Sequence, residues 1–136
     1  IPDTYVTDLD VRLGLYRRLA TLERNVECEG FAAELIDRFG DLPKEVNTLL
    51  VVVRIKAMCK KAQIARLDAG PKGATVQFHQ DKFPNPKGLV EFLHAQGNGA
   101  RIRDNKLVLP RDWSNEKEKL RGAFALARDL AEKAAL

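Results

Sequence analysis

The chain has 136 residues, of which 45% are hydrophobic and 31% are charged. These values are typical of a globular protein and exclude a disordered tail. No apolar run approaches the roughly 20 residues that span a bilayer, and the first residues lack the basic and apolar regions of a signal peptide. The sequence therefore predicts a cytoplasmic protein without membrane contact.

The net charge, the first residue and the two cysteines give weaker indications of partner, chain organisation and redox state. A net charge of +4 permits a weak attraction to nucleic acid or to an acidic partner, without predicting either. The chain opens with Ile1 instead of a methionine, which favours a segment of a longer polypeptide. The two cysteines, Cys28 and Cys59, lie in helical patterns and are interpreted as reduced, partly buried thiols.

Helical periodicity begins at Leu9 and is predicted to end near Glu23. Thr7 or Asp8 can act as the N-cap of this first helix, because both side chains accept hydrogen bonds from free backbone N–H groups. The apolar positions that recur at helical spacing, and are predicted to face the core, are Leu9, Leu13, Tyr16, Leu19 and Leu22.

The ten residues from Glu34 to Pro43 mark the end of a second helix and the start of a third. The second helix covers about 26–39 and stops at Gly40, since glycine readily follows a helix end. Pro43 suits the first position of the third helix, predicted over about 43–62. The core-facing residues are predicted to be Phe31, Leu35, Ile36 and Phe39 on the second helix and Val46, Leu49, Leu50, Val53 and Ala57 on the third.

Two hairpins and two helices follow. Gly70 to Gly73 separates the strands 64–69 and 74–78, and Asp104-Asn105 separates the strands 100–103 and 106–109. Between the hairpins a helix opens at Asn85-Pro86, and a last helix covers about 115–134. This order predicts an α+β fold, a small mostly antiparallel sheet built from two β-hairpins and covered by about five helices. Residues 1–136 are predicted to form a single domain.

Candidate catalytic and metal-ligating residues are few. His79 and His94 lie on different predicted elements, away from either cysteine, so two half-exposed histidines are favoured over a metal site. Lys56, Lys60 and Lys61 lie near Cys59 and would lower the pKa of its thiol, but a structural thiol is the favoured interpretation. No phosphate-binding glycine motif is present. The sequence predicts neither enzymatic activity nor a cofactor for this chain.

A basic stretch offers an alternative function. No acid interrupts the cations that run from the third helix into the first hairpin, namely Arg54, Lys56, Lys60, Lys61 and Arg66. Further charge surrounds the second hairpin, at Arg101, Arg103, Lys106 and Arg111. Such a patch can neutralise phosphates, so an accessory nucleic-acid-binding module is the alternative prediction. Trp113, just before the last helix, is interpreted as a hydrophobic staple.

The outer face of the second helix is the main candidate site. Glu34 and Asp37 are one turn apart and project from the same side, where they can meet arginines of a partner. Arg38 lies four residues after Glu34 and can equally pair with it inside the chain. The sequence leaves both possibilities open.

Several of these residues resemble a known family, the carboxy-terminal domain of bacterial transcription-repair coupling factor. The resemblance is carried by Ile1 to Val6, by Arg12-Leu13 and Tyr16-Arg17-Arg18, and above all by the run from Glu34 to Pro43. The similarity continues through Leu49-Leu50, Ile55-Lys56, Cys59, Ile64 and Leu67, and becomes loose afterwards.

The resemblance implies a non-catalytic module at the end of an ATP-driven DNA translocase, whose ATP and Mg²⁺ sites lie in other modules. In that family the terminal domain docks on the UvrB-like module of the same polypeptide. It thereby masks UvrA binding and restrains the motor until RNA polymerase is engaged, while other modules contact polymerase and duplex DNA. Glu34, Asp37 and Arg38 match the positions of the docking surface.

Overall fold

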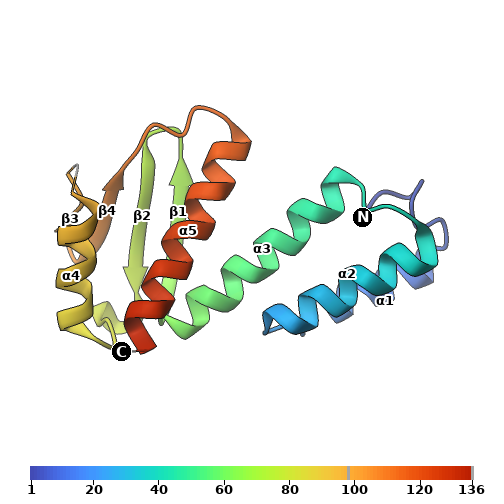
Figure 1. Cartoon of the computed structure of the whole chain (residues 1–136), viewed down its shortest axis with the longest axis horizontal. Helices are drawn as coiled ribbons and strands as arrows, with labels where there is room; N and C mark the ends of the chain where they lie inside the picture. The colour runs from blue at the N-terminus through green and yellow to red at the C-terminus, as the bar shows by residue number, and fades with distance from the viewer. Residues whose placement is uncertain (98, 136) are drawn as a thin grey trace. The chain divides into compact units, whose positions relative to one another are not determined.

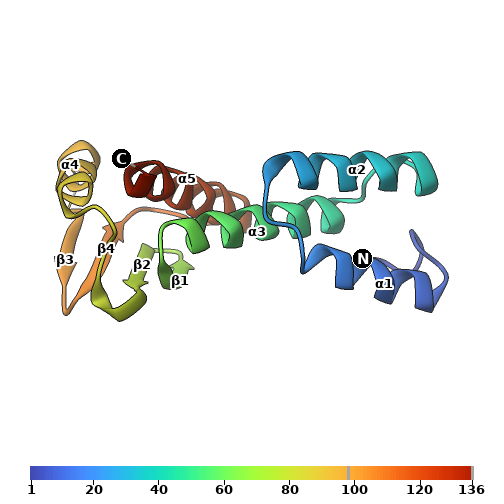
Figure 2. The same cartoon turned by 90° about the horizontal axis from the view of Figure 1, so that it is seen from below.

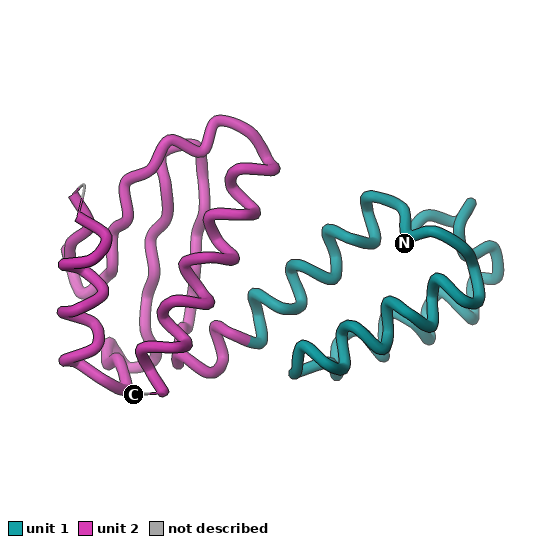
Figure 3. Tube along the Cα trace, viewed as in Figure 1, with its two compact units in different colours: residues 1–57 teal, residues 58–136 magenta. Residues whose placement is uncertain are grey.

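The structure is a computed structural model and describes residues 1–97 and 99–135. The described part of the chain contains five α-helices and a four-stranded antiparallel sheet, as the sequence predicts (Figure 1). It divides into two compact units, residues 1–57 and residues 58–136, which Figure 3 distinguishes by colour. Each unit has a hydrophobic core of its own where one domain was predicted. That the two units act as one module stays a prediction.

Unit 1 contains helix α1 (Leu9–Leu19), helix α2 (Asn25–Phe39) and most of helix α3 (Lys44–Lys61). The Asp8 carboxylate accepts a hydrogen bond from the Val11 N–H and caps α1. The helix ends at Leu19, four residues earlier than predicted, because the Thr21 N–H and hydroxyl both donate to the Arg18 carbonyl. The buried core residues of this unit are Val6, Leu15, Leu19, Phe31, Leu35, Val46 and Leu50.

The apolar positions predicted for the first helix are only partly its core face, because Leu19 is buried and Leu22 packs against the core but the other three positions do not. Leu9, Leu13 and Tyr16 are exposed, whereas Leu15 and Leu19 are buried and Val11 packs against them. Leucines occur on both sides of this helix, so periodicity alone does not distinguish the two faces. Ile36 of α2 is likewise exposed. In α3, Val46 and Leu50 are buried as predicted, and Leu49 and Val53 pack at the edge of the core.

A tyrosine secures the end of α2. The Tyr5 hydroxyl shares its one proton between the Gly40 carbonyl oxygen at 2.7 Å and the Leu35 carbonyl oxygen at 3.1 Å, and its ring packs against Phe39. Gly40 has a φ of 95°, a conformation that favours glycine, and so confirms the predicted stop. These contacts hold the last turn of α2 in place.

Unit 2 contains strands β1 (Ile64–Gly70), β2 (Gly73–Phe78), β3 (Arg101–Arg103) and β4 (Lys106–Pro110), with helices α4 (Pro86–Gln96) and α5 (Glu116–Ala135). A 3₁₀ turn, His79–Asp81, follows β2 and was not predicted. The sheet order is β1-β2-β4-β3, so the two hairpins join through β2 and β4. The register of β1 shifts between Ile64 and Arg66, so Ile64 and Leu67, although three residues apart, both pack against the core.

Both helices of unit 2 cover the same face of the sheet. Figure 1 shows α5 across the strands, and Figure 2 shows α4 and α5 together on one side of the sheet. The residues that point toward them form the core of the unit, including Val76, Phe78, Leu107 and Leu109 with Phe92 and Leu130. The opposite face therefore carries the alternate residues of each strand. Among the described residues, no helix is long and apolar enough to cross a membrane.

Candidate functional site on helix α2

An ion-pair cluster occupies the outer side of α2. The Glu34 carboxylate accepts two hydrogen bonds from the Arg18 guanidinium, at 2.5 and 3.1 Å, and one from Arg38 at 3.4 Å. Arg18 stands over the Phe31 ring at 5.0 Å and Arg38 over the Phe39 ring at 4.9 Å. The rings and the carboxylate together position both guanidinium groups.

Asp37 differs from Glu34 in the partners of its carboxylate. It is exposed, and we find no hydrogen bond or ion pair to its carboxylate within the described residues. Glu34 is satisfied inside unit 1, so the internal pairing with Arg38 that the sequence left open is present. Arg18, on α1, is the partner that sequence reasoning missed, because no spacing rule relates it to a residue sixteen positions later.

The two arginines alter the acidity of Glu34. The hydrogen bonds from Arg18 are the main reason that the pKa of Glu34 lies below its ordinary value, and Arg38 adds to the effect. The same hydrogen bonds raise the pKa of Arg18. At neutral pH the cluster therefore holds its charges, and the outer side of α2 presents Asp37 and Arg38 beside a neutralised Glu34.

This cluster predicts a pH dependence of stability. The pKa of Glu34 in the folded chain lies below its ordinary value of 4.5, so folding favours the ionised form. The stabilisation is present above about pH 4.5 and is lost as the pH falls through the lower folded pKa. We expect Glu34→Gln to lower the urea midpoint of the chain near neutral pH, and to lower it less at about pH 3.

Urea titrations followed by circular dichroism at the two pH values measure this difference. Asp37→Asn breaks no ion pair among the described residues and serves as the control. An equal effect of Glu34→Gln at both pH values would contradict the assignment of the pair.

The predicted basic patch is not one surface of one unit. Arg54 and Lys56 belong to unit 1, whereas Lys60, Lys61 and Arg66 belong to unit 2. The Arg54 Nε atom is buried, and we find no hydrogen-bond partner for it among the described residues. Arg66 pairs with Asp68 at 2.8 Å. Joint action of these five residues stays a prediction.

The other candidates show little sign of reactivity. Burial raises the pKa of the Cys59 thiol, which is the opposite of the activation that the neighbouring lysines suggested. Cys28 is buried in unit 1. Both His79 and His94 are exposed. Within the described residues, no group of three or more His, Cys, Asp and Glu side chains is arranged to hold a metal ion.

Comparison with known proteins identifies the family of this chain. The family model described as the TRCF domain matches residues 1–89, which is more than half of the chain. The chain belongs to the TRCF domain family. The match includes all of unit 1 and both strands of the first hairpin, and it therefore contains the α2 cluster.

Individual relatives agree with this assignment. The TRCF domain is 45% identical over 109 residues to the transcription-repair-coupling factor of Rickettsia conorii, covering 79% of this chain and 10% of that protein. It is 32% identical over 135 residues to the Escherichia coli transcription-repair-coupling factor, covering 98% of this chain and 12% of that protein. The chain thus spans about a tenth of the length of these relatives.

A solved structure extends the similarity to the fold. The crystal structure of the C-terminal domain of transcription-repair coupling factor superimposes with a TM-score of 0.80 at 26% identity, covering 99% of this chain and 88% of that one. This confirms the predicted α+β fold and the family resemblance over both units.

Proposed function

We propose that this TRCF domain is a non-catalytic regulatory module that docks on another module of the same polypeptide. In this proposal the partner is a UvrB-like module, and the docked domain masks UvrA binding and restrains an ATP-driven DNA translocase that works in the cytoplasm during transcription-coupled repair. RNA polymerase and duplex DNA contact other modules. The observation that carries the proposal is the exposed, charged outer side of α2, whose arginines are already held in position.

The ion pairs of α2 indicate different roles for the three predicted docking residues. Glu34 is neutralised by Arg18 and Arg38, so its role is to position Arg38 and not to bind a partner arginine. Asp37 is the carboxylate that offers its lone pairs to a partner. A docking contact therefore centres on Asp37 and Arg38, which can pair with an arginine and a carboxylate of the partner surface.

A contact of this kind suits a module that must open. Interfaces between modules of one chain are commonly polar and modest in area, which permits release. A preference of about 2.7 kcal/mol for the docked state keeps roughly 99% of molecules closed. Placing a like charge opposite a partner charge costs several kcal/mol and is enough to reverse that balance.

The test uses the full-length protein that contains this domain. We expect Asp37→Lys to increase the fraction of protein captured by immobilised UvrA by about tenfold or more, because the docked state loses its ion pair and gains a repulsion. The double variant Glu34→Lys/Asp37→Lys is expected to do the same. It also breaks the pair with Arg18, however, so the single variant is the cleaner measurement.

Asp112→Lys is the matched control, since Asp112 is an exposed carboxylate of unit 2. Circular dichroism of each variant verifies that the fold is intact. UvrA capture that stays at the wild-type level in a folded Asp37→Lys protein would refute the docking role of α2.

A further inference from the structure

The face of the sheet that α4 and α5 leave uncovered is polar and basic. Directly paired residues of neighbouring strands project from the same face, so the register defines which side chains lie together. Two rows cross the four strands, the first being Arg66, Gln77, Lys106 and Arg103, and the second Asp68, Thr75, Val108 and Arg101. We call these eight residues the open sheet face.

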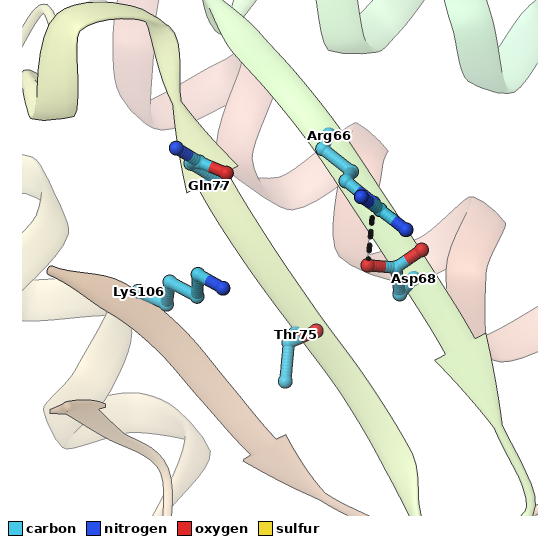
Figure 4. A pocket seen from close by; sticks show the side chains of 5 residues that line it. All are labelled: Arg66, Asp68, Thr75, Gln77 and Lys106. Carbon is cyan, nitrogen blue, oxygen red and sulfur yellow. Dashed lines mark ion pairs between the residues drawn. The ribbon is translucent and has the colours of Figure 1, made fainter. Parts of the chain in front are cut away.

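Two adjoining hollows lie on the open sheet face. The first has a volume of about 180 Å³ and is lined by Arg66, Gln77 and Lys106 of the first row together with Asp68 and Thr75, as Figure 4 shows. The second, of about 470 Å³, shares Asp68 and Thr75 with the first and extends past Val108 to Arg101 and the Lys72 turn. Both hollows therefore border Asp68 and Thr75 on the open sheet face.

Positive charge predominates on the open sheet face. The open sheet face carries four cations and one carboxylate, Asp68, which pairs with Arg66. The side chain of Arg66 is nevertheless 72% exposed, and that of Arg103 is 70% exposed although Asp104 lies 4.0 Å away. For the exposed Lys106 ammonium we find no partner within the described residues. Arg101 donates one hydrogen bond to the Gly99 carbonyl, and within the described residues we find no partner for its other donors.

The other side chains of this face indicate what kind of partner fits. Val108 is its one apolar residue and is only half exposed, so a protein partner finds none of the large apolar anchors that stable interfaces use. None of the eight residues is aromatic, which removes the stacking platform on which single strands depend. Guanidinium, ammonium, amide and hydroxyl donors are, in contrast, the groups that contact phosphate oxygens.

We propose that the open sheet face binds the phosphate backbone of duplex DNA, without reading its sequence. The two rows are two residues apart along each strand, which separates them by about 6.8 Å. Two successive nucleotides of one DNA strand rise by about the same distance along the axis of the duplex. Arg66 and Lys106 contact one stretch of backbone, and Arg101 contacts the next. This surface is independent of the docking contact on α2. Its four cations are all among the basic residues that the sequence indicated, but it excludes Arg54, Lys56, Lys60 and Lys61 of α3.

The experiment measures binding of the 136-residue chain to a fluorescent 20-base-pair duplex by anisotropy, over a series of salt concentrations. We expect a dissociation constant in the range of about 10⁻⁴ to 10⁻⁶ M, with affinity falling steeply as salt rises. Arg66→Ala/Lys106→Ala is expected to reduce the slope of log affinity against log salt by about two, because each lost phosphate contact removes about 0.9. Asp68→Asn is expected to strengthen binding several-fold, since it removes the one carboxylate of the face.

Lys87→Ala/Lys117→Ala is the matched control, because both lysines are exposed on the helices that cover the other face. Equal weakening by this control, an unchanged slope in Arg66→Ala/Lys106→Ala, or no binding at low salt would overturn the proposal. So would tighter binding of a single strand of the same length, or of a poly-glutamate peptide, because either outcome assigns the face to a different partner. Circular dichroism of every variant excludes unfolding as the cause of a loss.

Discussion

Gly73→Ala is expected to lower the free energy of unfolding of unit 2 by about 3 kcal/mol or more. Gly73 begins β2 with a φ of 122°, a conformation that side-chain-bearing residues rarely adopt. A Cβ atom at this position would lie 2.0 Å from the Leu109 carbonyl oxygen and 2.6 Å from the Arg111 nitrogen. Both neighbours are backbone atoms, so the strand itself must move.

Movement of this strand disturbs the centre of the sheet. Gly73 pairs with Gly70 on one side and Pro110 on the other, and the adjoining turn accepts hydrogen bonds from Arg111 and Trp113. These contacts join the two hairpins, so their loss weakens the entire unit. Trp113 is the single tryptophan of the chain, and its fluorescence follows the unfolding of unit 2.

The matched control is Gly70→Ala, at the other end of the same turn. A Cβ atom on Gly70 meets no heavy atom within 4 Å, so we expect little change or a small gain in stability. For a unit of this size, 3 kcal/mol lowers the melting temperature by roughly 12–24 °C. Equal melting temperatures of the two variants would show that the close approach of Gly73 to β4 is not a constraint.

Gly122→Ala is expected to destabilise unit 2 by about 1–3 kcal/mol and to shift the emission of Trp113 to longer wavelength. Gly122 lies in α5, where alanine is normally favoured by about 1 kcal/mol. Here, however, an added Cβ atom would lie 2.2 Å from the Cε2 and Cζ2 atoms of the Trp113 indole. The ring must leave its place against the helix and become more exposed to water.

Gly30→Ala is the corresponding control, since Gly30 is also inside a helix but an added Cβ atom meets nothing within 4 Å. We expect it to stabilise unit 1 by about 0.5–1 kcal/mol and to leave the emission unchanged. Denaturant titrations followed by fluorescence and circular dichroism measure both effects. A Gly122→Ala protein with wild-type emission and increased stability would contradict the packing of Trp113 on α5.

The contact of Trp113 with Gly122 also corrects its predicted role as a staple. Asn115 caps α5 by accepting a hydrogen bond from the Glu118 N–H, so Gly122 lies in the second turn of the helix. A staple would contact the first turn. The indole therefore fastens the segment after β4 to the second turn of α5.

Local chemistry was sufficient to determine where most elements begin and end. Gly40 and Pro43 separate α2 from α3, Asn85 caps α4, and Asp104-Asn105 turn with positive φ between β3 and β4. Each signal acts through the backbone of a few adjacent residues, so the sequence alone contains it. The identity of the family and the outward position of Glu34 and Asp37 on α2 were also readable, because they depend on motifs and helical spacing.

Tertiary structure decided everything that joins distant segments. Four features depend on residues far apart in the chain. They are the choice of α1 leucines that face the core, the pairing of Glu34 with Arg18, the division into two units, and the pairing of β2 with β4. The open sheet face is the clearest case, since its cations come from both hairpins and share one side only through the register of β2 and β4. Such contacts are selected by the total burial and charge of the folded chain, which no local pattern encodes.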